Sequence, residues 1–237
     1  MKHKTVVPFY LLFLLGSVNA WSEEAPAPAN ETYTKVCNSG QLAGKGACAA
    51  EPVLGTNLNQ WGCTRDNKTK LIWELKNDYK GLRDKDWTYT WYDPDMSQNS
   101  GYPGAKNGGE CIGSECDTHA YIELTNKKTL CGASNWRLPT KEELASLIYC
   151  SDSQYTPMQN TGEGGFICTS NAGHNKVAQP TINTAYFPNT VSNWFWTSSP
   201  SEGFNSYAWY VSMGVGKGYG TNGKYGSNSV RLVRNEE

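Results

Sequence analysis

The sequence has few histidines and none of the short motifs that mark common catalytic or nucleotide-binding sites. Three histidines occur among 237 residues, and two of them, His119 and His174, follow residue 20. Neither lies in a His-Glu-x-x-His metal motif, and the sequence has no Gly-x-Ser-x-Gly elbow and no phosphate-binding Gly-Lys-Ser/Thr loop. Although a catalytic triad can be assembled from scattered residues, these absences favour a protein without catalytic activity.

Long apolar runs are also absent, because no stretch after residue 20 reaches the roughly 20 apolar residues that a membrane-spanning helix needs. The first 20 residues resemble a signal peptide, with cationic Lys2 and Lys4, an apolar run over 6–15 and small residues up to Ala20. No cysteine closely follows the apolar run, which argues against a lipoprotein. We expect cleavage after Ala20 and export without a transmembrane segment. The sequence does not distinguish a secreted, cell-surface or periplasmic protein.

The chain carries no excess of positive charge. The whole sequence has a formal charge of −1, and removal of Lys2 and Lys4 with the signal peptide makes it −3. This balance gives no general electrostatic reason to bind nucleic acid. We therefore expect no nucleic-acid partner.

Cysteine pairs of the Cys-x-x-Cys type, which would suggest zinc, are missing as well, although cysteine itself is not scarce. All eight cysteines follow residue 20, and an even number in an exported chain favours disulfide bonds. Two local pairs, Cys37 with Cys48 and Cys150 with Cys168, are the first expectation, and the other pairings stay open. The eight are Cys37, Cys48, Cys63, Cys111, Cys116, Cys131, Cys150 and Cys168.

The organisation of the chain follows from its composition. Residues 21–35 are rich in proline and alanine and are expected to form a disordered linker. Residues 36–62 form a Cys/Gly-rich N-terminal extension, and one domain is expected over 63–235. With 9 Trp, 14 Tyr and 24 Gly, this domain should be held by aromatic packing, turns and disulfides.

The pattern of elements predicts an α+β domain with short helices and a mainly antiparallel sheet. Residues 71–75 read as a hairpin strand after the polar turn 66–68. A first helix is expected from Thr118, capped by Asp117. A second should follow the capping box of Thr140 and Glu143 and end near Cys150.

The C-terminal part is expected to consist of strands and turns. Residues 194–198 are aromatic and favour a strand, and residues 207–213 alternate in a way that predicts another. A Gly-rich turn over 214–226 should then lead to a closing strand over 229–234. Arg137, directly before the second helix, is expected to be structural rather than a ligand contact.

Aromatic residues in this part are the candidates for binding a ligand, because flat rings stack on sugars. Alternation places at least half of Trp194, Trp196 and Trp209 in the core. Tyrosines in the Gly-rich segment are expected to be more exposed, and such loops often carry recognition. The candidate ligand-binding residues are Tyr219, Tyr225, Tyr210 and Trp196.

Four acidic residues, Asp84, Asp86, Asp93 and Asp95, form a sequence cluster that could supply oxygen ligands to calcium. Their spacing differs from that of an EF-hand loop. The alternative is a solvated loop in which aspartates start turns, and this alternative is favoured. Calcium is the one cofactor that the sequence leaves open.

Six short blocks in a fixed order resemble the Lcl C-terminal domain family, which is named after a collagen-like bacterial adhesin. The resemblance covers about residues 63–235. The blocks are Thr64-Arg65-Asp66-Asn67 with Leu71-Ile72-Trp73-Glu74, Asn135-Trp136-Arg137-Leu138-Pro139-Thr140 with Glu143-Leu144, Tyr186-Phe187-Pro188-Asn189-Thr190, Phe195-Trp196-Thr197-Ser198-Ser199, Ala208-Trp209-Tyr210-Val211 and Val230-Arg231-Leu232-Val233-Arg234.

The resemblance implies a compact α+β domain related to the C-type lectin-like fold, found in surface and secreted bacterial proteins. The named adhesin binds sulfated glycosaminoglycans and forms trimers. This chain has no Gly-x-y repeat to drive trimerisation, and its slightly acidic charge weakens a claim on sulfated polymers. Formylglycine-generating oxidases, a distant branch of the fold, use a cysteine pair with copper, but residues 194–234 contain no cysteine.

Together these observations favour an exported, non-catalytic module that recognises a glycan or matrix component. A structural or assembly component of a cell-envelope appendage, with a protein partner, is the alternative, and an enzyme on a lectin-like scaffold is a third. The oligomeric state stays open, a homo-oligomer included.

Overall fold

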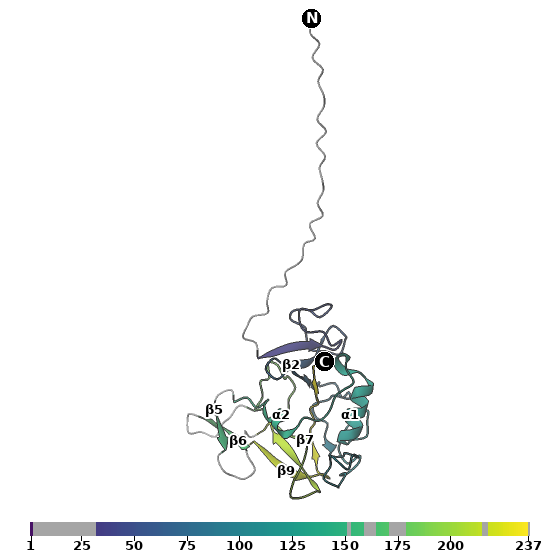
Figure 1. The fold of residues 1–237 in the computed structure, drawn as a ribbon, viewed down its shortest axis with the longest axis vertical. Coiled ribbons are helices and arrows are strands. Elements are labelled where there is room, and N and C mark those ends of the chain that lie inside the picture. The colour runs from purple at the N-terminus through teal and green to yellow at the C-terminus, as the bar shows by residue number, and fades with distance from the viewer. Residues whose placement is uncertain (2–31, 151–152, 159–164, 171–178, 215–217, 237) are drawn as a thin grey trace. The chain divides into compact units, whose positions relative to one another are not determined.

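The computed structural model describes residues 1, 32–150, 153–158, 165–170, 179–214 and 218–236. The chain divides into two units, Met1–Asn30 and Glu31–Glu237, and the fold below is that of the second unit (Figure 1). The expected signal peptide and most of the expected linker lie outside the described residues. None of the helices in the described part is both long and apolar enough to cross a membrane.

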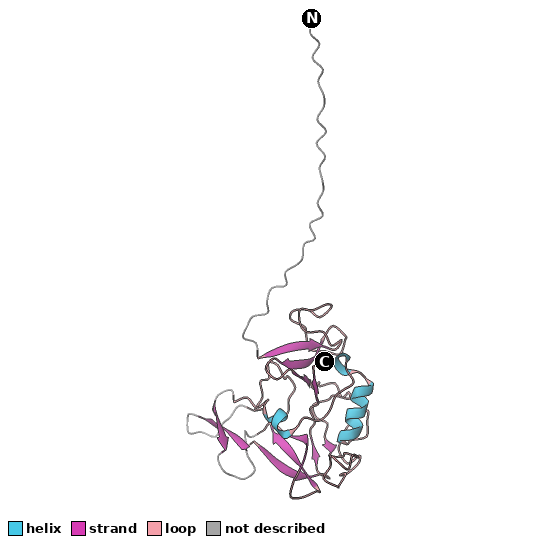
Figure 2. Ribbon diagram, viewed as in Figure 1, coloured by secondary structure: helices cyan, strands magenta, loops and turns pink. Residues whose placement is uncertain are grey.

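Short strands and loops make up most of the second unit, and helices contribute little (Figure 2). Over the described residues the elements are β1 (Tyr33–Cys37), β2 (Trp61–Asp66), β3 (Leu71–Glu74), β4 (Tyr89–Thr90), α1 (Thr118–Lys127), the 3₁₀ turn η1 (Leu130–Gly132), α2 (Lys141–Ala145), β5 (Ser153–Met158), β6 (Gly165–Ser170), β7 (Trp194–Pro200), β8 (Tyr207–Ser212), β9 (Tyr219–Gly223), β10 (Ser227–Asn228) and β11 (Val233–Asn235).

The strands form small sheets in which every named pair is antiparallel. One sheet has four strands in the order β1-β2-β3-β11, and another has three in the order β7-β8-β9. Strands β4 and β10 form a two-stranded sheet, as do β5 and β6. The expected mainly antiparallel, disulfide-stapled domain with short helices is confirmed.

Strand β3 of the four-stranded sheet and strand β7 of the three-stranded sheet have buried side chains on both faces. Successive side chains of a strand point to opposite faces. The buried apolar side chains of the described part form two core clusters. In β3, Ile72 belongs to one cluster and Trp73 to the other. In β7, Phe195 and Trp196 divide in the same way. The two clusters therefore meet across the sheets.

The hairpin expected at residues 66–75 is present as β2 and β3. The Asp66 carboxylate accepts hydrogen bonds from the backbone N–H groups of Lys68, at 2.8 Å, and Thr69, at 3.2 Å. Lys70 takes a left-handed conformation with φ of 63°. An aspartate that bonds the backbone two residues ahead starts the turn, and the sequence identified it correctly.

Both helices begin where the sequence predicts. The Asp117 side chain caps α1 by accepting from Ala120 N at 2.9 Å. The Thr140–Glu143 capping box at α2 is complete in both directions. However, α2 ends at Ala145 instead of near Cys150, because Ile148 forms an antiparallel bridge with Ile182.

Four disulfides connect all eight cysteines. The two expected local pairs, Cys37–Cys48 and Cys150–Cys168, are present. The remaining pairs are Cys63–Cys131 and Cys111–Cys116.

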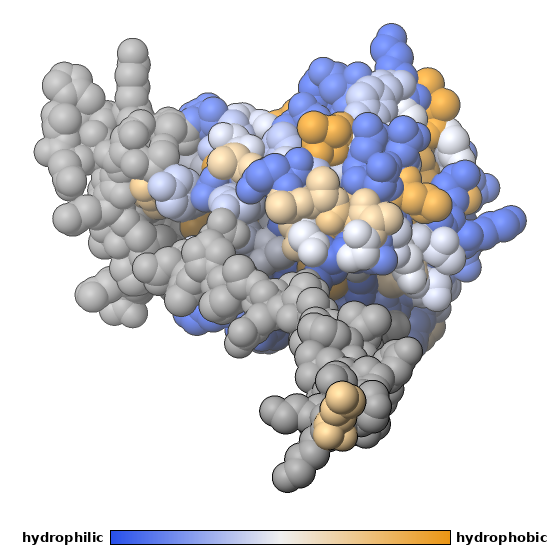
Figure 3. Space-filling view, turned by 90° about the horizontal axis from the view of Figure 1, so that it is seen from above, coloured by the Kyte–Doolittle hydropathy of each residue, from blue (hydrophilic) through white to orange (hydrophobic). Residues whose placement is uncertain are grey.

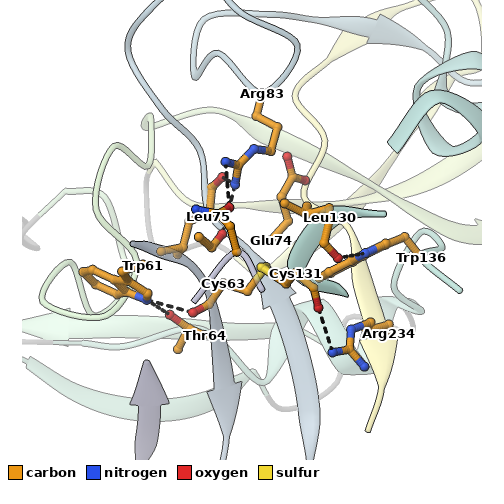
Figure 4. The surroundings of a disulfide bond; sticks show 12 residues. Trp61, Cys63, Thr64, Glu74, Leu75, Arg83, Leu130, Cys131, Trp136 and Arg234 are labelled. Carbon is orange, nitrogen blue, oxygen red and sulfur yellow. Dashed lines mark hydrogen bonds between the residues drawn. A yellow bond between two sulfur atoms is a disulfide. The ribbon is translucent and has the colours of Figure 1, made fainter. Parts of the chain in front are cut away.

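The buried Cys63–Cys131 bond joins β2 to η1 in the middle of a dense hydrogen-bond network (Figure 4). Trp61 Nε1 donates to the carbonyl of Cys63 at 2.8 Å, and Trp136 Nε1 donates to that of Leu130 at 2.9 Å. These bonds fix the backbone on both sides of the bridge.

Two expectations for the chain's organisation are wrong in detail. Tyr33–Lys35 belong to β1 and pair with β2, so the expected linker does not extend to residue 35, and the two ends of the N-terminal extension belong to the four-stranded sheet. The segment 214–226 is not only a turn, because β9 lies within it. Tyr219 is therefore a strand residue.

Candidate functional site

Aromatic side chains gather on one face of the β8–β9 pair. Val211 lies opposite Tyr219 in the antiparallel register, so these two residues project to the same face. Alternation along β8 adds Trp209 and Tyr207 to that face. We call the partly or fully exposed aromatic residues of this face the aromatic strip: Phe204, Tyr207, Trp209, Tyr219 and Tyr225.

Ring contacts join members of the aromatic strip in pairs. Trp209 and Tyr219 meet edge to face, with their centroids 5.6 Å apart, and Phe204 lies 5.8 Å from Tyr207. A Cβ added to Gly223, which pairs with Tyr207, would lie 2.6 Å from Cε1 of Tyr225. The Tyr225 ring therefore covers Gly223 and extends the strip to the end of β9.

A lysine from α2 covers part of the aromatic strip. Lys141 Nζ lies 4.3 Å from the ring centroid of Trp209 and 5.2 Å from that of Tyr219. Such cation–π contacts hold the lysine chain against the rings. Phe204 and Tyr225, at 69% and 71% exposure, remain the most accessible members.

The opposite face of the same sheet carries a second, smaller aromatic pair. Trp194 and Tyr210 are stacked, with centroids 4.4 Å apart and an interplanar angle of 13°. A Cβ on Gly220 would lie 2.8 Å from the Tyr210 hydroxyl, so glycine is needed under this ring. Tyr210 is thus separated by the sheet from Tyr219 and Tyr225.

The sequence-derived ligand candidates therefore divide. Tyr219 and Tyr225 lie on the aromatic strip and Tyr210 on the other face. The prediction that Trp196 contacts a ligand is wrong, because its side chain is fully buried and its Nε1 donates to the Tyr89 carbonyl at 2.7 Å. Of the three tryptophans expected mainly in the core, only Trp196 is buried; Trp209 is half-buried and Trp194 is 43% exposed.

A cleft of about 720 Å³ lies next to the N-terminus of α2. One side is formed by the loop that carries Asp93, Gln98 and Ser100. The facing walls come from α1, the segment before α2, and the end of β7 with the following loop. Its lining is Trp91, Tyr92, Asp93, Gln98, Ser100, His119, Ile122, Arg137, Leu138, Thr140, Ser198, Ser199, Pro200 and Glu202.

The arginine in this cleft is held by the protein itself. Arg137 donates to both carboxylate oxygens of Glu143 at 2.7 Å. This bidentate geometry raises the pKa of Arg137 through its hydrogen bond to Glu143. Arg137 is therefore structural, and its charge is compensated by Glu143.

The four aspartates considered as calcium candidates separate into two groups. Asp84 and Asp86 lie together with Asp78, all three offering oxygens within 4.8 Å of one another. Lys85 Nζ already lies 3.3 Å from an Asp78 oxygen and 2.8 Å from an Asp86 oxygen. An ammonium group thus compensates this cluster.

The other two aspartates of the predicted calcium site start turns and are not part of that cluster. The Asp93 carboxylate accepts from Asp95 N at 2.9 Å, and that of Asp95 accepts from Ser97 N at 2.9 Å. Asp84 behaves similarly, accepting from Asp86 N at 3.0 Å. Asp84, Asp93 and Asp95 thus each bond the backbone two residues ahead, as aspartates that start turns do, although Asp84 is buried rather than solvated.

The sequence reading missed a buried charged network at the centre of the domain. The carboxylate of Glu74 accepts from Lys76 Nζ at 3.0 Å, from the Tyr121 hydroxyl and from Leu232 N at 2.9 Å. Arg231 donates to the Glu74 carbonyl at 2.5 Å. Burial lowers the pKa of Lys76 to about 8, while Glu74 opposes the shift. The network joins β3, α1 and the C-terminal segment.

A second cavity, of about 370 Å³, lies beside the Cys63–Cys131 bond. Its lining includes the exposed Leu58 and Tyr79 and the side chain of Arg83.

Figure 3 shows one face of the molecule, on which apolar side chains form small groups between hydrophilic ones.

Comparison with known families places these features in context. The model of the Lcl C-terminal domain matches residues 62–234, most of the chain. The chain belongs to the Lcl C-terminal domain family. No curated protein and no solved structure matches the chain.

The family's sequence blocks occupy both structural and accessible positions in this Lcl C-terminal domain. Arg137 and Thr140 line the cleft and also hold the start of α2. Ser198 and Ser199 line the opposite wall. The block around Trp209 contributes to the aromatic strip. The loop residues that complete the cleft lie outside the six blocks.

Proposed function

We propose that this chain is an exported, non-catalytic binding module that recognises a glycan through the aromatic strip. The observation that carries the proposal is the set of five neighbouring aromatic side chains on one face of β8 and β9. Aromatic rings offer large apolar contact area together with polar tips. A sugar ring has apolar faces and hydroxyl edges, so it matches such a surface.

Membership of an adhesin-related family and the four disulfides support this proposal. Disulfide-dense domains belong to oxidising compartments outside the cytoplasm. We place the fold among relatives of the C-type lectin-like fold, which the short helices and small antiparallel sheets support. The scaffold would be rigid, and its exposed rings would carry recognition.

Glycan-array binding followed by titration calorimetry tests the proposal on oxidatively folded protein starting at Trp21. Tyr225→Ala removes the most exposed ring of the strip, and Trp209→Ala removes its centre. Each should weaken binding about tenfold, as expected for an interface hot spot. Tyr79→Ala is the matched control, because Tyr79 is 55% exposed and lies outside the strip.

Two results would contradict glycan recognition on the strip: absence of binding to any glycan, or equal affinities in wild type, Tyr225→Ala and Trp209→Ala. Near-ultraviolet circular dichroism of each variant verifies that the fold is intact. Tyr225 is exposed, so its removal should leave the spectrum nearly unchanged.

A protein partner within a cell-envelope assembly is the second candidate function. Its support is the cavity beside Cys131, which exposed Leu58 and Tyr79 border. Exposed apolar side chains around a cavity are common at protein interfaces. Co-purification with an envelope assembly that depends on Leu58, and not on Trp209, would favour this function.

A further inference from the structure

We propose that the 720 Å³ cleft beside α2 binds a sugar unit that carries a free ammonium group. The inference rests on the proposed glycan recognition and deepens it. It names the chemical class of the unit next to the aromatic strip. The carboxylates of Asp93 and Glu202 are the central contacts.

The cleft and the aromatic strip are neighbours along α2. Thr140 lines the cleft, and the next residue, Lys141, covers Trp209 and Tyr219. Lys141 N also donates to Ser199 Oγ, on the cleft wall, at 3.2 Å. An oligosaccharide that stacks on the strip can therefore place an adjacent unit in the cleft.

The charges of the lining favour a cation over an anion. Asp93 and Glu202 have no ion-pair partner among the residues that the structure describes. Arg137 is the one lysine or arginine in the described lining, and Glu143 binds it on both oxygens. His119, which also lines the cleft, is charged only when it is protonated, and its Nε2 lies 3.4 Å from a Glu123 oxygen. A sulfate or uronate group would therefore meet two carboxylates and no unpaired lysine or arginine in the described lining.

Two lysines lie near the cleft but do not line it. Lys106 Nζ lies 4.9 Å from the Tyr92 ring centroid. Lys224 is buried behind the loop, where its Nζ donates to the carbonyls of Asn99 and Tyr102 at 2.7 Å. The charge of Asp93 opposes the lowering of the Lys224 pKa by burial, so Asp93 is partly balanced from behind the loop and Glu202 is the less compensated carboxylate of the cleft.

The other polar groups of the cleft suit the hydroxyls of a sugar ring. Gln98 and Ser100 are exposed on the loop side, and Ser198 is half-buried on the wall from β7. An amide and two hydroxyls can both donate and accept hydrogen bonds. The half-buried Tyr92 adds an aromatic wall. The lining therefore combines two carboxylates with neutral hydrogen-bonding groups.

The test compares the glucosamine tetramer with its fully N-acetylated counterpart by titration calorimetry. A mildly acidic buffer keeps the sugar amines protonated. Wild type should bind the glucosamine tetramer about five- to tenfold more tightly, which is the size expected for two partly exposed charge contacts. The preference should shrink as salt is added.

The double variant Asp93→Asn/Glu202→Gln should reduce this preference to about one. Asp93→Asn keeps an oxygen that can accept from Asp95 N, so the loop should be retained. Glu51→Gln/Glu110→Gln changes the net charge equally at exposed positions outside the cleft and should leave the preference intact.

The possible outcomes separate this inference from the proposed function. Equal binding of both tetramers by wild type, or a preference unchanged in the cleft variant, overturns the inference. Loss of all binding in Trp209→Ala would then still support the strip. If Trp209→Ala binds normally and the cleft variant loses the preference, the cleft inference stands and the strip proposal fails.

Discussion

Replacing Glu74 with glutamine should destabilise the domain strongly, because three donors from different segments depend on one buried carboxylate. Lys76 Nζ and the Tyr121 hydroxyl share one oxygen, and Leu232 N uses the other. Glutamine keeps the shape but has a single side-chain oxygen, and its NH₂ group would face a donor. At least one donor loses its acceptor, and the Lys76 ammonium loses its counter-charge.

The magnitude follows from the burial of the pair, since Glu74 and Lys76 are both buried. Removing one partner of a buried ion pair costs about 3–5 kcal/mol. Stabilities of domains are about 5–15 kcal/mol, so this is a large share. For a domain of this size, the loss corresponds to a fall in Tm of about 6–20 °C.

Guanidinium unfolding of oxidised protein, followed by tryptophan fluorescence, measures the effect. Glu51→Gln is the matched control, because Glu51 forms an exposed pair with Lys35 and its loss should cost less than about 1 kcal/mol. The double variant Glu74→Gln/Lys76→Met should recover part of the loss, since no ammonium is left unpaired. A cost below about 1 kcal/mol for Glu74→Gln, or strict additivity in the double variant, would refute the reasoning.

Two further predictions concern the disulfides and a buried lysine. Replacing Cys63 and Cys131 by serine should cost about 4 kcal/mol in unfolding free energy, against about 2 kcal/mol for Cys111 and Cys116, because the sequence separations are 68 and 5 residues; equal costs in chemical denaturation would contradict this loop-closure argument. Burial lowers the pKa of Lys224 to about 8, below its ordinary value, so the unfolded state binds more protons and stability should rise between pH 8 and about 10. In urea titrations over this window, Lys224→Met should show a smaller rise than wild type, and identical slopes would argue against the shift.

Local signals in the sequence were sufficient for much of the fold. The Asp66 turn, the cap at Asp117 and the Thr140 capping box each act within a few residues, so their patterns are visible without tertiary information. The strand at Tyr33–Cys37 was missed because it pairs with residues about 30 positions away. Strand β9 was missed because its glycines suggested a turn, whereas Gly220 is required by the Tyr210 ring above it.

The candidate site was only partly accessible from the sequence for a similar reason. Tyr219 and Tyr225 were identified from composition, but which face each ring occupies depends on strand register. Trp196 and Trp194 share the same alternation phase, yet one is buried and the other exposed. Lys141 carried no signal at all, because its contact with Trp209 arises from the packing of α2 on the sheet.

The position of the aromatic strip gives a physical reason to expect selective binding there. The face of β8 that carries Trp209 continues directly into the core at Val211, and Tyr219 packs against the same core cluster. Two members of the strip are therefore fixed by packing and by Lys141 before any ligand arrives, which lowers the entropy lost on binding. Phe204 and Tyr225 lie at the exposed end. A ligand would thus meet ordered rings next to α2 and adaptable rings farther along, and variants of Trp209 should affect affinity more than variants of Phe204.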